Sequence, residues 1–230
     1  MTTVTPDLQL RTLFVVDSDH RITASADTSA RSAALFTLIR GKSNVAWGVR
    51  DDVRTDIADE LDRLATDEPP LSDFQDPPLH ADKYQSLLGG EISSGPAFIF
   101  PDEIPKPADV ELVDRLELLE RHFRGWIAEE IPGCSPIVAV VERGYPVSVC
   151  FCATKNSAPA VEAGLETAPD YRRCGFAARV TAAWAYAIRA SGLIPLYSTN
   201  WSNTASLAVA RKLRLIQYAS DWSLVAKPQR

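Results

Sequence analysis

Cysteine and histidine are scarce in this sequence, and their scarcity limits the kinds of site that it can build. Its four cysteines and three histidines form no cluster with the spacing of zinc ligands. Cys150 and Cys152 are too close together in the chain to act as an ordinary disulfide staple. We therefore expect no metal site, and free thiols of the kind that persist in a reducing cytoplasm.

Long apolar runs and an excess of basic residues are also missing. No stretch approaches the roughly 20 consecutive apolar residues of a membrane span. The first residues, MTTVTPD, have neither the basic nor the apolar region of a signal peptide. The net charge of −6 disfavours a nucleic-acid partner. We expect a cytoplasmic protein that binds neither nucleic acid nor membrane.

What is present is enough apolar sequence for a sizeable core. Hydrophobic residues make up 46% of the 230 positions, as in an ordinary globular protein. That length suits one large domain or one and a half. We predict an N-terminal α+β subdomain at residues 1–92 and a main domain at residues 93–230.

The N-terminal part predicts alternating short elements. Apolar runs at Leu10–Val16 and Val45–Val49 predict strands, Ser29–Ile39 predicts a short helix, and the proline-rich residues 66–80 predict a loop. A further helix is expected after Asp51 or Asp52, one of which would lie near its cap, because apolar residues then recur at helical spacing. These residues are Val53, Ile57, Leu61 and Leu64.

The second part predicts a helix and then a meander of strands. An apolar stripe favours a helix over Asp109–Glu130. Three antiparallel strands, helix, strand, helix and strand follow, with Gly192 at the position of a helix C-cap. The expected strands are Ile137–Val141, Pro146–Ala153, Ala160–Thr167, Ile194–Thr199 and Gln217–Ala226, with Asn203 capping the second helix.

A basic turn between one of these strands and an alanine-rich helix carries the clearest chemistry. The turn reads Arg172, Arg173, Cys174, Gly175, Phe176, Ala177. A helix start leaves about four backbone N–H groups without partners, and its dipole makes that end positive. Glycine lets a ligand approach the backbone closely, and the arginines add bidentate donors. The turn therefore predicts a site for a phosphate or pyrophosphate group.

In this context the chain resembles the GNAT-type N-acetyltransferases. The motif R-x-x-G-x-A at Arg172–Ala177 is followed about thirty residues later by Asn203 and Ser206 at the start of the next helix. The sequence of residues 171–177, 195–203 and 209–213 is most similar to that of a bacterial branch that includes zwittermicin-resistance-type acetyltransferases. The resemblance covers roughly residues 135–226.

The resemblance implies both a fold and a set of roles. The fold is an α/β (α+β) one, a mixed and mostly antiparallel sheet flanked by helices, splayed near its centre to admit the pantetheine arm of acetyl-CoA. Backbone groups of Leu165 to Thr167 would pair with that arm. Amides of the turn would meet the pyrophosphate, and Asn203 and Ser206 would line the far side. The residues implied to bind the cofactor are Leu165, Thr167, Arg172, Arg173, Cys174, Gly175, Phe176, Ala177, Asn203 and Ser206.

A general base is also implied, and two glutamates compete for the role. Glu162 and Glu166 lie four apart, so a regular strand places both side chains on one face. Either fits the glutamate that accepts the amine proton in this family. Both would instead be structural if they are salt-bridged or lie at a strand edge.

The sequence departs from the family pattern at three places. Ala210 stands where many members have a tyrosine that acts as general acid. Tyr197, Ser198, Ser206 or water would have to replace it, although Tyr197 fits core packing better. Arg173 stands where glycine is usual, and Arg214 replaces the glycine that commonly ends the last helix.

The sequence thus predicts an enzyme that moves the acetyl group of acetyl-CoA to a primary amine, by direct attack in a ternary complex. A small-molecule acceptor is expected. Two alternatives remain open: a non-catalytic acyl-CoA-binding module of the same fold, and an acetyltransferase that acts on protein lysines or N-termini.

Overall fold

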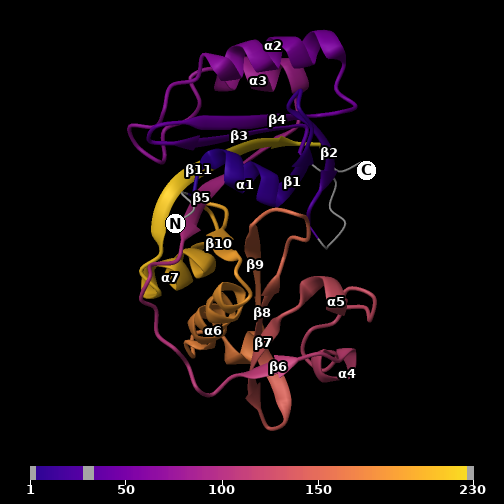
Figure 1. Ribbon diagram of the computed structural model, residues 1–230, viewed down its shortest axis with the longest axis vertical. Helices are drawn as coiled ribbons and strands as arrows, with labels where there is room; N and C mark the ends of the chain where they lie inside the picture. The colour runs from indigo at the N-terminus through magenta and orange to yellow at the C-terminus, as the bar shows by residue number, and fades with distance from the viewer. Residues whose placement is uncertain (1–3, 28–33, 227–230) are drawn as a thin grey trace. The chain divides into compact units, whose positions relative to one another are not determined.

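The computed structural model describes residues 4–27 and 34–226, which form two compact units (Figure 1). The first unit comprises the chain up to Phe98, together with Ser198–Asn203 and the segment that begins at Gln217. The second comprises Ile99–Tyr197 and Thr204–Ile216. The predicted division between residues 92 and 93 stays a prediction.

The first unit is a mixed sheet with helices on both faces. Its strands lie in the order β1-β2-β4-β3-β11-β5, where β2 and β4 are parallel and β3 pairs antiparallel with both β4 and β11. The elements are α1 (Pro6–Leu13), β1 (Phe14–Val16), β2 (Arg21–Ser25), β3 (Phe36–Gly41), β4 (Val45–Arg50), α2 (Thr55–Thr66), α3 (Ala81–Leu88), β5 (Glu91–Ile99) and β11 (Ile216–Val225).

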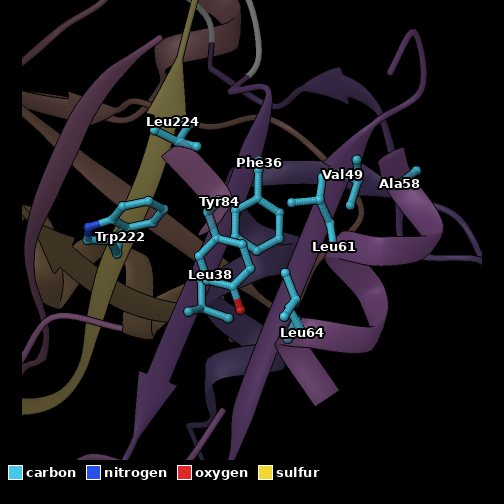
Figure 2. Close-up of a cluster of buried hydrophobic side chains, with 10 residues drawn as sticks. Phe36, Leu38, Val49, Ala58, Leu61, Leu64, Tyr84, Trp222 and Leu224 are labelled. Atoms are coloured by element: carbon cyan, nitrogen blue, oxygen red, sulfur yellow. The ribbon is translucent and has the colours of Figure 1, made fainter. Parts of the chain in front are cut away.

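Strand alternation gives the first unit two apolar layers. Phe36 and Leu38 point from β3 toward α2 and α3, where they meet Trp222 and Leu224 of the paired strand β11 (Figure 2). Ile39 points to the opposite face and packs with Leu10 of α1. The β3 side chains are all buried because both faces of the strand are covered.

A buried ion pair fixes the proline-rich loop at residues 67–80. Glu68 accepts hydrogen bonds from the backbone N–H groups of Leu79 and His80, at 2.9 Å each, and from the Tyr84 hydroxyl at 3.1 Å. Arg40 lies 3.8 Å from the same carboxylate and also donates to the carbonyl of Asp76. Burial lowers the pKa of Arg40, and the neighbouring carboxylates partly oppose that shift. The loop is therefore held by a satisfied polar network.

Two predictions for the first unit were wrong. Leu10 to Leu13 belong to helix α1, which begins after Thr5 because the Thr5 hydroxyl accepts from Leu8 N–H at 3.2 Å and Pro6 follows it. The helix predicted at Ser29–Ile39 is replaced by β3 from Phe36 onward; residues 28–33 lie outside the described residues. The helix predicted after Asp52 is confirmed as α2, which follows Arg54; it has no side-chain cap, and Asp52 binds Arg50 at 2.6 Å.

The second unit contains the meander and the predicted strand–turn–helix. Its strands lie in the order β10-β9-β8-β7-β6, antiparallel except for β10 and β9. The mixed, helix-flanked sheet of the predicted fold class is thus confirmed. The elements are β6 (Glu111–Val113), α4 (Leu116–Leu119), α5 (Ile131–Cys134), β7 (Ile137–Glu142), β8 (Tyr145–Cys152), β9 (Ala160–Thr167), the 3₁₀ turn η1 (Pro169–Tyr171), α6 (Phe176–Ala190), β10 (Ile194–Ser198) and α7 (Thr204–Lys212).

Helix α6 covers one face of this sheet, and the segment at residues 114–135 covers the other. On the α6 face, burial raises the pKa of the Cys150 thiol, and a hydrogen bond with Thr181 opposes that shift. On the opposite face, Val149 and Phe151 of β8 pack with Leu119, Phe123 and other residues of the 114–135 segment.

The long helix predicted over Asp109–Glu130 was wrong. Val113 pairs with Ile137 in strand β6, and Gly125 has a φ of +114°, which a helix cannot accommodate. The stripe of apolar residues nevertheless identified buried side chains, since Val113, Leu119 and Phe123 all lie in one core cluster. Helical spacing predicted which residues are buried here, but not the path of the backbone.

Helix α7 ends in a left-handed residue that is not glycine. Arg214 has a φ of +54°, and the N–H of Leu215 donates to the carbonyl of Ala210 at 2.9 Å. This bond closes the helix in the manner of a Schellman motif. The replacement of glycine by arginine therefore does not remove the left-handed stop, but a side chain makes that conformation costly.

We predict that Arg214→Gly raises the free energy of unfolding by about 1 kcal/mol, because glycine adopts positive φ without steric cost. Chemical denaturation of the full chain measures the change. Arg211→Gly is the matched control: Arg211 lies in the last turn of α7, so glycine there should destabilise by about 1 kcal/mol. Equal destabilisation by both variants would contradict the prediction.

Candidate functional site

The central feature of the second unit is a strand pairing that ends early. Within the described residues, β10 pairs with β9 through Ile194–Ala160, Pro195–Val161 and Leu196–Glu162. Strand β9 then continues for five residues to Thr167, beyond the end of this ladder. On its other side β9 remains paired with β8 from Ala163 to Thr167. The β10-facing backbone edge of residues 163–167 can therefore accept a ligand as an added strand.

The turn after β9 folds back through two left-handed residues. Arg172 donates from Nε to the carbonyl of Thr167 at 3.3 Å, which ties the turn to the end of the strand. Arg173 has a φ of +64° and Gly175 a φ of +80°. Positive φ at Arg173 explains why glycine is usual at that position in the family that the sequence resembles.

Helix α6 begins directly at this turn without a side chain over its first amides. Gly175 is its N-cap and makes no side-chain hydrogen bond, and no acidic residue lies in the first turn. The first amides, from Phe176 on, are therefore those that a helix start leaves for an external acceptor. Arg179, also in the first turn, is paired with Asp109 and lies over the Phe176 ring at 5.2 Å.

Lys212, at the end of α7, lies beside this turn and was not predicted from the sequence. A Cβ built on Gly175 would lie 2.7 Å from Lys212 Nζ, so the ammonium group lies against the start of α6. It joins the exposed Arg172 and Arg173 in giving the turn a positive charge. The sequence offered one hint: Arg211 and Lys212 form a basic pair at the end of α7, in the block quoted for the family resemblance.

Strand alternation places Glu162 and Glu166 on the face opposite α6. Glu166 pairs across the sheet with Val149, which belongs to the core cluster of the 114–135 segment. Leu165 pairs with Cys150 on the α6 face, and there the Thr167 and Ser148 hydroxyls lie 2.8 Å apart. The strand therefore separates the two glutamates from the side chains of Leu165 and Thr167, as a period of two requires.

Glu166 has a perturbed carboxyl group. Its oxygen Oε1 accepts a hydrogen bond from the indole N–H of Trp126 at 3.3 Å. The residue is exposed over much of its surface, yet the carboxyl lies beside an aromatic ring. Partial desolvation raises the pKa of Glu166 above its ordinary value, and the Trp126 hydrogen bond opposes that shift. A base with a raised pKa is better matched to neutral pH.

Glu162 lies in a different environment, at the end of the β9–β10 ladder. The residue is 5% exposed, and its N–H donates to the Thr154 hydroxyl at 3.1 Å. Its carboxylate acts on the neighbouring Tyr197: burial raises the pKa of Tyr197 to about 12, with smaller contributions from Cys150 and Glu162.

Tyr197 is a packed core residue in this structure. It is 2% exposed, and its hydroxyl donates to the carbonyl of Ser206 in α7 at 3.3 Å. Ala210, at the position of the family's tyrosine, is also buried. The second unit thus brings together the turn, the free edge of β9, the two glutamates and Ser206. Asn203 belongs to the first unit and is exposed.

In residues 4–27 and 34–226, no group of three or more His, Cys, Asp or Glu side chains is arranged to hold a metal ion. No helix in that part of the chain has the length and apolar character needed to cross a membrane.

Comparison with known proteins gives one family match. Residues 138–218, less than half of the chain, match the model of the family described as GNAT acetyltransferase. That range contains the turn, the free edge of β9 and both glutamates. No curated protein matches the sequence.

Several solved structures are distantly similar. An acetyltransferase of the GNAT family from Colwellia psychrerythraea is 11% identical, with 91% of this chain and 79% of that chain covered and a TM-score of 0.49. A GCN5-related N-acetyltransferase-like protein from Streptococcus suis is 17% identical, with 83% of this chain and 84% of that chain covered and a TM-score of 0.47. A GCN5-related N-acetyltransferase from Kribbella flavida is 19% identical, with 66% of this chain and 65% of that chain covered and a TM-score of 0.48.

The family match therefore carries the assignment. It indicates an acyltransferase, with an acyl-CoA as the donor and a second molecule as the acceptor.

Proposed function

We propose that this protein transfers the acetyl group of acetyl-CoA to the primary amine of a small molecule, by direct attack in a ternary complex. One observation carries the proposal: an uncapped helix start with a left-handed glycine lies at the end of a strand whose edge is free. The first feature suits a diphosphate and the second an extended amide-containing arm. Coenzyme A contains both groups in that order.

Donor binding follows from these two features. The amides from Arg173 to Ala177 would bind the pyrophosphate, with Arg172, Arg173 and Lys212 supplying charge. Cys174 is exposed in the same turn and contributes its backbone. The backbone of Leu165 to Thr167 would pair with the pantetheine amides, with Ser206 on the far side.

The transfer step needs a neutral amine and a leaving thiolate. The amine lone pair attacks the thioester carbonyl carbon, the C–N bond forms, and the C–S bond breaks with its electrons going to sulfur. A carboxylate on β9 accepts the amine proton, and we assign this role to Glu166 because its carboxyl is reachable and its pKa is raised. A thiol pKa near 8.5 makes the thiolate an adequate leaving group without a tyrosine at Ala210.

A non-catalytic acyl-CoA-binding module is the second candidate. It is favoured by Ala210 and by the burial of Tyr197, since neither offers an acid to the leaving sulfur. Tight acetyl-CoA binding with no amine-dependent release of CoA would support it. An acceptor on a protein, either lysine or N-terminus, is a third possibility that the same assay tests with peptides.

Three finer assignments belong to the same proposal. The free thiols Cys150, Cys152 and Cys174 fit a cytoplasmic location. The wording of residues 171–177 fits the branch that includes zwittermicin-resistance-type enzymes. Residues 1–92 would then form an added N-terminal α+β subdomain, and residues 93–230 the acetyltransferase domain.

We predict that Gly175→Val abolishes acetyl-CoA binding, because a branched side chain blocks approach to the helix start. Gly192→Val is the matched control, since Gly192 follows the other end of α6 at φ +82° with nothing within 4 Å of a Cβ. Both variants should lose about 1–2 kcal/mol of stability from left-handed strain. Calorimetry should find binding lost in the first alone; unchanged affinity in Gly175→Val would remove the main support for the donor site.

The two glutamates are separated by isosteric substitution. We expect Glu166→Gln to lower kcat/KM by about 10²-fold or more, as removal of a general base does. Glu162→Gln should change it by less than about 10-fold, because Glu162 is buried at the end of the ladder. Rates of CoA release over pH 6–9 measure both. The reverse order of effects would assign the base to Glu162.

Tyr197→Phe tests whether the buried hydroxyl has a role in catalysis. We expect a loss of about 1 kcal/mol in stability from the missing bond to Ser206, and kcat within about 2-fold of the parent. Thermal unfolding and CoA release at saturating substrate measure the two. A large fall in kcat with unchanged stability would instead make Tyr197 the acid.

A further inference from the structure

The face of β9 that holds the glutamates also holds a small aromatic wall. Gly164 lies between Glu162 and Glu166, and a Cβ there would be 2.3 Å from Cε2 of Phe151 on the paired strand β8. The Phe151 ring therefore lies flat over the strand in the space that a side chain would take. The two carboxylates are separated by a ring and not by a third polar group.

Trp126 extends this wall and joins it to Glu166. Its ring meets Phe151 edge to face, with centroids 4.7 Å apart and an interplanar angle of 79°. Its indole N–H donates to Glu166 at 3.3 Å. Trp126 and Phe151 are each half-buried, so both present part of their ring surface to solvent. The preceding Gly125, at φ +114° with nothing within 4 Å of a Cβ, carries the turn that presents Trp126.

The chemistry of these groups is selective. The two rings offer apolar surface and π faces, which attract flat hydrocarbon groups and organic cations. The indole N–H is already engaged by Glu166, and the glutamates add negative charge. A polyhydroxylated amine would bury hydroxyl groups against these rings without hydrogen-bond partners, and that desolvation costs free energy. An amine carried on a flat apolar group would bury that group against the rings and place its nitrogen beside Glu166.

We propose that the acceptor is a primary amine carried on a flat apolar group such as an aromatic ring, and that Trp126 determines this specificity and positions Glu166. The proposal rests on the proposed acetyl transfer, because it places the acceptor at the same carboxylate. Trp126 acts in two ways that can be separated: its ring forms the wall, and its N–H orients the base.

The first experiment measures acceptor preference with the full chain and acetyl-CoA. The probes are 2-phenylethylamine, tryptamine, glucosamine and a lysine-containing peptide, with CoA release as the readout. We expect kcat/KM for the two arylalkylamines to exceed that for glucosamine and for the peptide by about 10²-fold, the scale of pocket discrimination by apolar contact and unpaired polar groups. Equal rates, or a preference for either polar acceptor, would overturn the proposal.

Three variants test Trp126 itself. Trp126→Ala should lower kcat/KM for 2-phenylethylamine by about 10- to 100-fold more than that for glucosamine, because loss of the N–H affects both acceptors whereas loss of the ring affects only the aromatic one. Trp126→Phe should restore KM but shift the acidic limb of the pH profile upward, because loss of the N–H removes a hydrogen bond that lowers the pKa of Glu166. Ile127→Ala, at a neighbouring side chain that is 51% exposed, is the control and should change neither value.

Failure of the inference differs from failure of the proposed function. If Trp126→Ala lowers both acceptors equally, or Trp126→Phe leaves the pH profile unchanged, Trp126 only supports the fold and the inference is wrong. If no amine is acetylated although acetyl-CoA binds, the enzymatic function is wrong. In that case, calorimetry measures binding of 2-phenylethylamine independently of catalysis. Binding that Trp126→Ala abolishes supports an aromatic amine site at Trp126, and absence of binding rejects it.

Discussion

The site depends on a ladder of only three residue pairs between β9 and β10. Within it the two strands share backbone hydrogen bonds; beyond Glu162 the strand β9 keeps its partner β8 and presents its other edge. A backbone edge in that state needs a partner, because unpaired amides are costly when water is excluded. The turn at Arg172–Gly175 lies at the far end of the same edge. On the proposed function, the strand edge and the helix start form one continuous surface for the extended, anionic coenzyme A.

Local patterns predicted most of the second unit, but only part of the first, namely β4, α2 and the proline-rich loop. The meander, the basic turn and helix α6 were each marked by alternation or by glycine, and the structure confirms them. Strand β3 was missed because both its faces are buried, so its apolar run has no alternation to distinguish it from a helix. The segment at residues 109–130 has helical spacing, but β6 pairing and Gly125 determine its path. Such long-range pairing is invisible to a local pattern.

The candidate site shows the same division. The motif predicted the turn and the uncapped helix start, and strand parity placed Glu162 and Glu166 on one face as expected. Lys212 was missed because its place beside Gly175 depends on how α7 packs against α6. Trp126 was read as part of a helical stripe, and its bond to Glu166 spans forty residues of sequence. Contacts of that range follow from the fold and not from spacing.

Strand β9 also works as a partition. Residues of even number turn toward the 114–135 segment, and residues of odd number turn toward α6. On the proposed function, the even-numbered residues of β9 would help to select the acceptor, and the odd-numbered residues would help to bind the donor. Substitutions in the 114–135 segment would then change which amine is acetylated and leave the affinity for coenzyme A unchanged. Removing a single β9 residue would exchange the two sets and mix both tasks at once.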